Sequence, residues 1–306
     1  MDHMTLLQRQ LTAAFPELDL RLEEPLARYT SFRIGGPAEV MAFPRSQNEL
    51  AQLLQGADQM GIRPVILGAG TNILAPDEGR RGLVICTKGC LDGVEQVDST
   101  HIRALAGTAM AFLAAFAANA GLSGLEFAHG IPGSVGGGLY MNAGAYGGEM
   151  KQVVESVQYF DRKGQAFCRS ISELEFSYRK SMFTGTEYVI ASAVFALTKA
   201  PEAEIKGRMQ ELMQKRRASQ PLEYPSAGST FKRPQNGYAA ALIEQAGLKG
   251  MRVGDAAVSE KHAGFVVNLG HATQRDVLDL IGQIQARVME TSGIFLEPEV
   301  IRLSER

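Results

Sequence analysis

The segment over residues 121–148 concentrates the features of a ligand site, because it holds ten of the 33 glycines of the chain. Glycine loses more backbone freedom on folding than any other residue, so such a cluster needs a physical reason. A flexible linker would be rich in serine and poor in apolar side chains. This segment instead carries residues that can pack, among them Phe127, Ile131 and Leu139. We therefore predict that its backbone N–H groups approach a bulky, phosphorylated ligand.

A second glycine loop, Gly68-Ala69-Gly70-Thr71-Asn72, follows an apolar stretch. It is similar to the start of the Rossmann dinucleotide fingerprint, which needs a third glycine and a helix directly afterwards. Ile73 occupies the third position, and Pro76 and Gly79 would break a helix. The loop is therefore either a tight turn between strands or a nest of N–H groups that holds a pyrophosphate.

Glu299 lies in a stretch whose alternation puts four residues on one face of a predicted strand: Phe295, Glu297, Glu299 and Ile301. Carboxylates that share a face with apolar side chains belong either to a polar pocket in the core or to a solvated edge strand. Charge and Pro298 would protect such an edge from pairing. The pattern alone leaves both interpretations open.

Arg179 and Ser229 are two further polar candidates. Arg179 stands beside Lys180, so it is either a solvated surface residue or an anion-binding group. Ser229 follows Gly228, where a serine is either a turn former or a reactive hydroxyl. Spacing assembles no Ser/His/Asp constellation from the chain.

The apolar periodicity predicts the elements that position these residues. A capping-box pattern, Ser46 with Glu49, opens a helix that closes near Gly61, and the strand–helix–strand unit around it favours parallel pairing. Thr108 is expected to cap a helix that runs through Ala120. Other helices are expected after Pro201, with Ile205, Met209, Leu212 and Met213 on one face, and from Thr273 to Gly293. Strands are expected over residues 40–43, 64–67, 83–86, 94–97, 101–106, 153–160, 164–170 and 188–197.

Composition narrows the class of protein. A chain of 306 residues suggests about two domains, and the change of pattern at Pro201 puts their boundary near residue 200. The net charge of −2 argues against nucleic acid or an anionic membrane as main partner. Three cysteines without a C-x-x-C motif and five scattered histidines indicate reduced thiols and no metal site. We expect a soluble cytoplasmic protein without a signal peptide or membrane span.

Seven motifs together resemble the UDP-N-acetylenolpyruvoylglucosamine reductases, the flavoenzymes that complete UDP-N-acetylmuramate for peptidoglycan. In chain order they occupy residues 30–37, 67–72, 130–137, 142–147, 177–179, 228–232 and 296–300. The match covers nearly the whole chain and agrees with the shorter subtype, which lacks a tyrosine-bearing insertion. Two residues depart from the common pattern: Tyr29 and Arg233 stand where many members have Asn.

The resemblance implies an α+β fold. A two-lobed FAD-binding region of the p-cresol methylhydroxylase type would span residues 1–200, with lobes of about 1–88 and 89–200. An α/β substrate-binding domain would follow over 201–306, and its last strand would return to the first lobe. The implied cofactors are FAD and NADPH, and the implied partner is a small nucleotide sugar rather than an obligatory protein.

The resemblance also assigns site residues. Catalysis would fall to Arg179, Ser229 and Glu299, and substrate binding to Tyr146, Arg217 and Lys232. The FAD would be held by two groups of residues: Gly68, Ala69, Gly70, Thr71 and Asn72, and Gly130, Ile131, Gly133, Ser134, Gly136, Asn142, Ala143 and Gly144.

The implied reaction has two halves: NADPH reduces FAD, and hydride then passes to the terminal carbon of the enolpyruvyl double bond. Arg179 and a protonated Glu299 would stabilise the charge that develops at the substrate carboxylate. Ser229 would protonate the neighbouring carbon, with Lys232 able to assist. Two alternatives remain: an FAD-dependent oxidase or dehydrogenase of a small alcohol or hydroxy acid, and a catalytically silent nucleotide-sugar binding protein.

Overall fold

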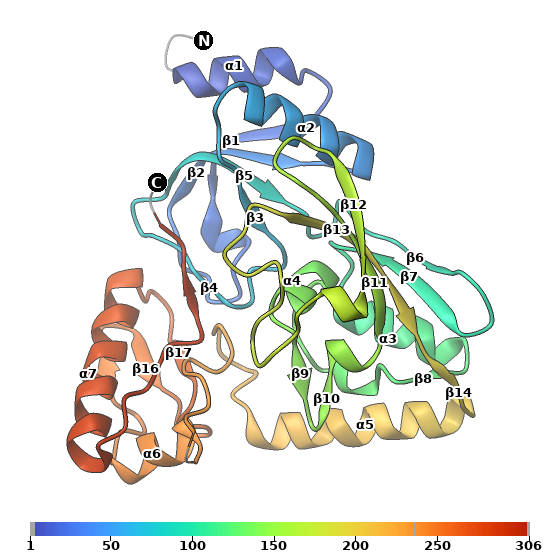
Figure 1. Ribbon diagram of the computed structural model, residues 1–306. Helices are drawn as coiled ribbons and strands as arrows, with labels where there is room; N and C mark the ends of the chain where they lie inside the picture. Colours follow the sequence, from blue (N-terminus) through green and yellow to red (C-terminus); the bar gives the residue numbers. More distant parts are fainter. Residues whose placement is uncertain (1–3, 236, 305–306) are drawn as a thin grey trace. The chain divides into compact units, whose positions relative to one another are not determined.

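The computed structural model describes residues 4–235 and 237–304 (Figure 1), and the chain forms two compact units. The first unit consists of Met1–Leu22, Val40–Ala69 and Gly82–Lys215. The second consists of Glu23–Glu39, Gly70–Arg81 and Arg216–Arg306. Each unit has its own cluster of buried apolar side chains. Two N-terminal segments thus belong to the unit that contains the C-terminal third of the chain.

A four-stranded sheet has the order β1 (Asp19–Pro25), β2 (Pro37–Phe43), β5 (Arg80–Cys86) and β3 (Val65–Leu67). The expected strands at 40–43, 64–67 and 83–86 are confirmed, and β3 pairs with β5 in parallel. The strands on either side of helix α2 (Gln47–Gln59) are not neighbours, however, because β5 lies between them. The sheet is accompanied by helix α1 (Leu6–Ala14) and by the short 3-10 helix η1 (Leu26–Arg28).

The start of α2 has half of the predicted capping box. The Ser46 hydroxyl accepts from the Glu49 N–H at 3.1 Å, as expected. The Glu49 carboxylate, however, accepts from the N–H of Arg45 at 2.7 Å. One side of the helix buries Leu50, Leu53, Leu54 and Ala57 as the periodicity predicts.

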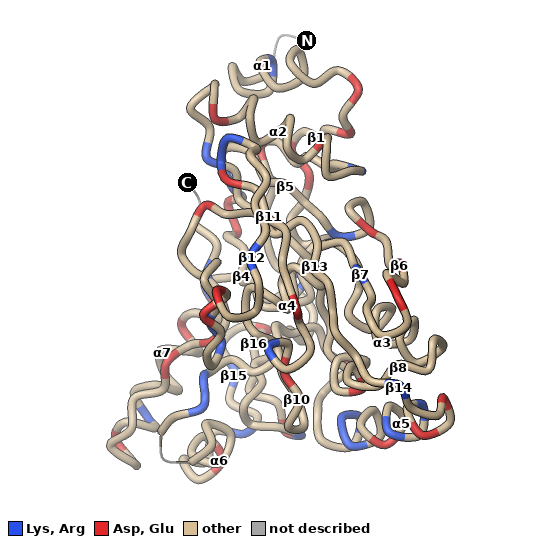
Figure 2. Tube along the Cα trace, turned by 45° about the vertical axis from the view of Figure 1, so that its right-hand side comes forward, with Lys and Arg blue, Asp and Glu red and all other residues tan. Residues whose placement is uncertain are grey.

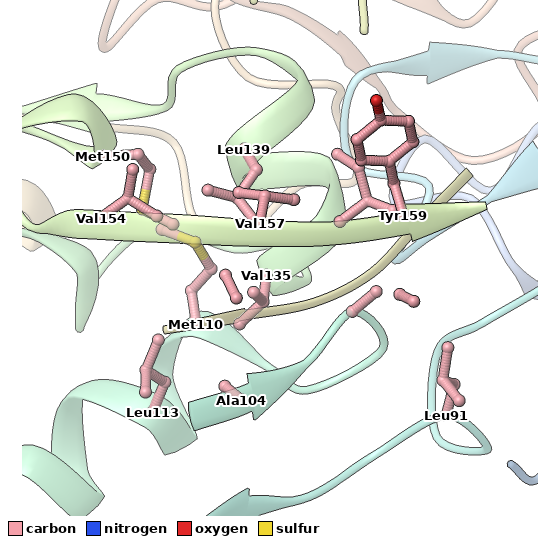
Figure 3. Close-up of a cluster of buried hydrophobic side chains, with 14 of the residues drawn as sticks. Leu91, Ala104, Met110, Leu113, Val135, Leu139, Met150, Val154, Val157 and Tyr159 are labelled. Carbon is pink, nitrogen blue, oxygen red and sulfur yellow. The ribbon is translucent and has the colours of Figure 1, made fainter. Parts of the chain in front are cut away.

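A five-stranded antiparallel sheet has the order β12 (Ala166–Ser170), β11 (Val154–Phe160), β13 (Val189–Ala196), β7 (His101–Leu105) and β6 (Val94–Gln96). All five strands were expected. Helices α3 (Met110–Asn119) and α4 (Val135–Tyr140) pack on it, and Figure 3 shows apolar side chains of β11 facing those of the helices. Irregular register in β11 brings Val154, Val157 and Tyr159 into this core.

Thr108 does not cap α3, so that prediction was wrong. The helix begins after Ala109, which makes no side-chain cap. The Thr108 hydroxyl instead accepts from the N–H of Gly93 and donates to its carbonyl, both at 3.0 Å. The first N–H groups of a helix can bond to a side chain or to water, and a buried threonine hydroxyl is equally satisfied by a neighbouring backbone. Gly121 stops the helix with φ of 67°, as expected.

Short elements complete the first unit. They are β8 (Leu122–Ser123), β9 (Gly144–Ala145), β10 (Gly148–Glu149), β14 (Thr198–Lys199) and the 3-10 helices η2 (Glu126–Ala128), η3 (Met150–Gln152) and η4 (Ile171–Glu173). Helix α5 (Glu202–Ser219) confirms the helix expected after Pro201. Acidic and basic residues alternate along it (Figure 2), with pairs such as Lys215 with Glu211 at 2.6 Å. No helix among the described residues is both long and apolar enough to cross a membrane.

The second unit is built on the sheet β15 (Arg252–Val253), β16 (Ala256–Val258) and β17 (Val266–Asn268), with helices α6 (Ala239–Gln245) and α7 (Gln274–Ser292). Helix α7 matches its prediction in full. Thr273 and Asp276 form a reciprocal capping box, and Gly293 ends the helix in the left-handed conformation.

Long-range hydrogen bonds attach the two N-terminal segments to this unit. Asn268 is buried and donates through Nδ2 to the Phe32 carbonyl at 3.0 Å. The Asp77 carboxylate accepts from the N–H groups of Gln274 at 2.7 Å and Arg275 at 3.2 Å. Strand β18 (Ile301–Arg302) also pairs in parallel with β4 (Ile73–Leu74).

The predicted strand over residues 295–301 is largely wrong, because only Ile301 and Arg302 form a strand. Proline lacks the N–H that a ladder needs, and Pro298 makes a single isolated bridge with Phe231. Phe295 is 64% exposed and Glu297 is exposed as well. The solvated alternative therefore holds for these two residues, while Glu299 is half-buried.

Candidate active site

The loop Gly68–Asn72 offers a run of backbone donors. Within the described part of the chain, the N–H groups of Gly68, Ala69, Gly70 and Thr71 donate to no protein acceptor. No helix follows the loop, since β4 begins at Ile73, which confirms that the Rossmann interpretation does not apply. Consecutive unused N–H groups form a concave donor set that suits phosphate oxygens. This donor set fits a dinucleotide pyrophosphate.

The loop before α4 has a similar character. Ser134 caps the helix by accepting from the Gly137 N–H at 3.4 Å, while Gly136 N–H donates to the Ala106 carbonyl at 2.8 Å. Among the described residues, the N–H groups of Gly130 and Gly133 donate to no protein acceptor. Ile131 and Gly133 are half-buried, and Pro132 is exposed. A small-residue loop with unused donors is compatible with the predicted flavin contact.

The glycines of these loops are also needed by the protein's own packing. A Cβ on Gly70, whose φ is 61°, would lie 2.0 Å from the Tyr29 carbonyl oxygen. A Cβ on Gly68 would lie 2.5 Å from Ser134 Oγ, and one on Gly136 would lie 3.0 Å from the Ala106 Cβ. Distances below 3.0 Å require a local shift of the chain. Close approach of neighbouring backbone and side-chain atoms thus explains part of the glycine content without any ligand.

Arg179 lies in a tight turn over residues 177–180. The N–H of Ser177 donates to the Lys180 carbonyl at 3.1 Å, and the N–H of Lys180 donates to the Ser177 carbonyl at 3.2 Å. Arg179 has φ of 57°, a conformation that non-glycine residues seldom adopt. Its guanidinium lies 5.2 Å from the ring centre of Tyr178, and the side chain is half-buried.

Tyr146 lies at the tip of the hairpin that β9 and β10 form. Tyr146 and Gly147 have φ of 53° and 89°, the pattern of a two-residue type I′ turn. The Tyr146 side chain is 41% exposed, so it is available to a ligand. Ala143 and Gly144, which were predicted to line the flavin, are half-buried in the same segment.

Asn142, predicted to bind the cofactor, is 1% exposed, and its side chain bonds to the protein. Its Nδ2 donates to Glu149 Oε2 at 2.9 Å and to the Ser177 carbonyl at 3.1 Å. Its Oδ1 accepts from the Lys151 N–H at 3.0 Å. Sequence reasoning missed this link to the Arg179 turn, because nothing in the spacing of residues 142 and 177 signals it.

Ser229 and Glu299 come from neighbouring segments of the second unit. The Glu299 N–H donates to the Thr230 carbonyl at 2.8 Å. The side chain of Asn72 bonds to the same segment, since its Nδ2 donates to the Glu299 carbonyl at 3.0 Å. Ser229 is exposed whereas Thr230 is buried, so the serine residue is accessible. The structure thus brings together one predicted cofactor residue and two predicted catalytic residues.

Thr230 holds the Ser229 segment to the core. Its N–H donates to the Gly264 carbonyl at 2.9 Å, and its hydroxyl accepts from the Val266 N–H at 2.9 Å. The N–H of Gly264 in turn donates to His262 Nδ1. Burial lowers the pKa of His262 below its usual value, so this imidazole is neutral at pH 7 and can accept that hydrogen bond.

The remaining predicted substrate residues are cations of the second unit. Lys232 pairs with the Glu297 carboxylate, and its N–H donates to the Glu297 carbonyl at 2.8 Å. Arg217 is exposed, and its carbonyl accepts from Lys261 Nζ at 2.7 Å. Arg233, which replaces the usual Asn, lies over the ring of Tyr238 at 4.2 Å. Arg179 and Tyr146 belong to the other unit.

Comparison with known proteins identifies the family. A family model described as the C-terminal domain of UDP-N-acetylenolpyruvoylglucosamine reductase matches residues 220–303. A model described as an FAD binding domain matches residues 38–167, which include both glycine loops.

Whole-chain relatives agree with the two models. A UDP-N-acetylenolpyruvoylglucosamine reductase of Caldanaerobacter subterraneus is 46% identical over 97% of this chain and 98% of the relative. The enzyme of that name from Agathobacter rectalis is also 46% identical, with the same coverage. The crystal structure of the UDP-N-acetylenolpyruvylglucosamine reductase of Thermus caldophilus superposes with a TM-score of 0.79. It is 36% identical and covers 94% of this chain and 99% of its own. The chain belongs to the UDP-N-acetylenolpyruvoylglucosamine reductase family.

Proposed function

We propose that the protein is an NADPH-dependent flavoenzyme that reduces the enolpyruvyl group of UDP-N-acetylglucosamine-enolpyruvate to give UDP-N-acetylmuramate. It would act in the cytoplasm, in the synthesis of peptidoglycan precursors and hence in cell shape and division. The observation that supports this most directly is the local pairing of the Ser229 and Glu299 segments beside Asn72, joined by hydrogen bonds of 2.8 and 3.0 Å. An acidic residue and a hydroxyl residue are thereby held next to a predicted cofactor loop.

The cofactor would be held mainly by backbone donors. The N–H groups of Gly68 to Thr71 suit the pyrophosphate, and the loop over residues 130–137 would contact the flavin. Residues 1–200 would form the cofactor region and residues 201–306 the substrate domain. Bound FAD supplies the hydride that is taken from NADPH and delivered to the substrate double bond.

Arg179 and Glu299 would act on the substrate carboxylate. Hydride addition at the terminal carbon leaves negative charge on the carbon next to the carboxylate, and the carboxylate shares that charge. The Arg179 fork can donate two hydrogen bonds to it. Glu299 helps only in its protonated form, as a hydrogen-bond donor, because a second anion would repel the developing charge.

Ser229 would supply the proton. A serine hydroxyl is a weak acid, so this transfer is favourable only because the carbanion is a strong base. Ser229 is exposed, so the substrate carbon can approach it. The Glu297 carboxylate holds the Lys232 ammonium in place near this segment, where it can bind the substrate and assist the proton transfer.

Flavin content and substrate dependence test this function. We expect the purified protein to absorb near the flavin maxima and to oxidise NADPH only when UDP-N-acetylglucosamine-enolpyruvate is present. Protein without bound or bindable flavin would indicate a silent nucleotide-sugar binding protein. Yellow protein that ignores the enolpyruvyl substrate but oxidises a small alcohol or hydroxy acid would indicate an oxidase or dehydrogenase.

A further inference from the structure

Two segments of the first unit, residues 142–146 and 175–179, contain most of the non-glycine residues with a strained backbone. Six non-glycine residues within residues 4–235 and 237–304 have positive φ, and four of them lie in these segments: Asn142, Tyr146, Glu175 and Arg179, with φ between 43° and 57°. Such conformations cost on the order of 1 kcal/mol or more and persist only where the surroundings impose them. Something must therefore hold both segments in place.

The turn that presents Arg179 is held from both sides. Its third position has positive φ, which in a type II turn is normally given to Gly or Asn. Before the turn, the Ser177 carbonyl accepts from Asn142 Nδ2 at 3.1 Å. After it, the Ser181 hydroxyl donates to the Tyr140 carbonyl at 2.9 Å. Both contacts lead to the end of α4 and the residues that follow it.

Asn142 is the centre of this arrangement. One amide proton bonds to Glu149 Oε2, which closes the base of the hairpin that carries Tyr146, and the other bonds to the Ser177 carbonyl. The amide oxygen accepts from the Lys151 N–H. Both donors and one acceptor position of the amide are therefore used inside the protein, and the side chain is 1% exposed.

We propose that Asn142 is a positioning residue that fixes the Arg179 turn relative to the Tyr146 hairpin. This inference rests on the proposed function of Arg179 in the reduction of the enolpyruvyl group. The amide acts through geometry: it holds a strained turn so that the guanidinium stays where the substrate carboxylate binds. A misplacement of about 1 Å can cost on the order of 10²-fold in rate.

The first test is Asn142→Asp, which keeps the shape of the side chain and its tolerance of positive φ. It removes the two Nδ2–H donors and places a carboxylate oxygen opposite both the Ser177 carbonyl and Glu149. We expect the oxidation of reduced flavin by the enolpyruvyl substrate to slow about 10²-fold. Reduction by NADPH and the flavin content should remain close to those of the unmodified protein, because the Asn142 side chain is buried and bonds to the protein rather than pointing to a ligand. Gln152→Ala is the matched control, because Gln152 contacts the Gly147 carbonyl of the same hairpin and does not bond to the turn.

The double variant Asn142→Asp/Glu149→Gln separates the two hydrogen bonds. The amide introduced at position 149 can donate to the carboxylate introduced at position 142, so the base of the hairpin and the thermal stability should recover. The Ser177 carbonyl still faces an oxygen, so the second half-reaction should stay slow. Recovery of that half-reaction together with stability would assign the effect to the hairpin and overturn the proposal.

A cycle with Arg179→Ala decides whether Asn142 acts through the arginine. If it does, Asn142→Asp slows the second half-reaction in the parent protein but adds less than about twofold in the Arg179→Ala background. Equal effects in both backgrounds would overturn the positioning role. So would a variant Asn142→Gly, compatible with positive φ, whose second half-reaction is as fast as that of Gln152→Ala.

Different results would contradict the proposed function and the positioning role of Asn142. An unmodified protein that does not oxidise NADPH with the enolpyruvyl substrate contradicts the function itself. A fully active Arg179→Ala variant contradicts the role of Arg179 and the inference with it. An impaired Arg179→Ala variant beside an unimpaired Asn142→Asp variant contradicts the inference alone.

Discussion

At the scale of single residues, Ser229 depends on the conformation of the residue before it. Gly228 has φ of 74°, and a Cβ built on it would meet no atom within 4 Å. The glycine is therefore needed for its backbone conformation and not for close packing. It turns the chain so that Ser229 is exposed while Thr230 is buried and bonded to the core. This combination of a fixed backbone and an accessible residue suits a proton donor.

Ser229→Ala should separate the two half-reactions. The variant should bind FAD and accept hydride from NADPH at a near-normal rate, because the hydroxyl takes no part in that step. Oxidation of the reduced flavin by the enolpyruvyl substrate should slow on the order of 10²–10⁴-fold, as is typical when a general acid is lost. Rapid mixing measures both steps. Ser229→Cys, which keeps a donor, should recover part of the rate, and an unimpaired second step in Ser229→Ala would exclude Ser229 as the donor.

Arg179→Lys keeps the positive charge and removes the planar, two-pronged geometry of the guanidinium, so it tests whether that geometry matters. Lysine and arginine have a similar free-energy cost at positive φ, so the substitution should leave the stability of the turn unchanged. It cannot donate two parallel hydrogen bonds, and one charge-assisted bond is worth about 1.5–3 kcal/mol. We therefore expect kcat/KM for the enolpyruvyl substrate to fall about tenfold or more. Lys180→Arg is the neighbouring control. Unchanged kinetics would mean that Arg179 is a solvated surface residue.

At the scale of elements, sequence patterns predicted correctly the features whose bonding partners lie within a few residues in the chain. Helix α7 was predicted with its caps because Thr273, Asp276 and Gly293 act within a few residues of the backbone that they satisfy. Thr108 and the 295–301 stretch failed for the opposite reason. The partner of Thr108 is Gly93, and the partner of the Pro298 segment is the segment of Phe231. Neither partner is visible to a window of about ten residues.

Asp77 gives the clearest stability prediction at this scale. Its carboxylate accepts from the first two N–H groups of α7, at 2.7 and 3.2 Å, in addition to the cap by Thr273. Asp77→Ala leaves these N–H groups without their acceptor and removes a negative charge from the positive end of the helix. We expect a loss of about 1–2 kcal/mol in the free energy of unfolding.

Urea unfolding, followed by circular dichroism, measures the Asp77 effect. Glu78→Ala is the matched control, because Glu78 is the adjacent carboxylate and is exposed. It should change the free energy of unfolding by less than about 0.5 kcal/mol. Equal midpoints for the two variants would show that Asp77 does not stabilise the start of α7.

At the scale of the whole molecule, the chain passes repeatedly between two compact units. The loop Gly68–Asn72 spans one such passage, since Ala69 ends a segment of the first unit and Gly70 begins a segment of the second. Sequence patterns predicted two domains with a boundary near residue 200. They did not reveal that residues 23–39 and 70–81 join the C-terminal unit, because the bonds of Asn268 and Asp77 that attach these segments span about 200 residues or more.

Removal of FAD should lower the thermal stability of the protein and increase hydrogen exchange in the two loops that are predicted to hold the cofactor. A ligand that binds only the folded protein stabilises it by about 2.7 kcal/mol at 100 times its Kd. We expect the apoprotein to unfold at a lower temperature and the Tm to rise with added FAD. Hydrogen exchange should be fastest without FAD at residues 68–71, 130 and 133, where N–H groups have no acceptor within the described chain. FAD should slow exchange there, whereas peptides of α7, whose hydrogen bonds are internal, serve as the control. A Tm that does not depend on FAD, or protection confined to other segments, would remove these two loops from the cofactor site.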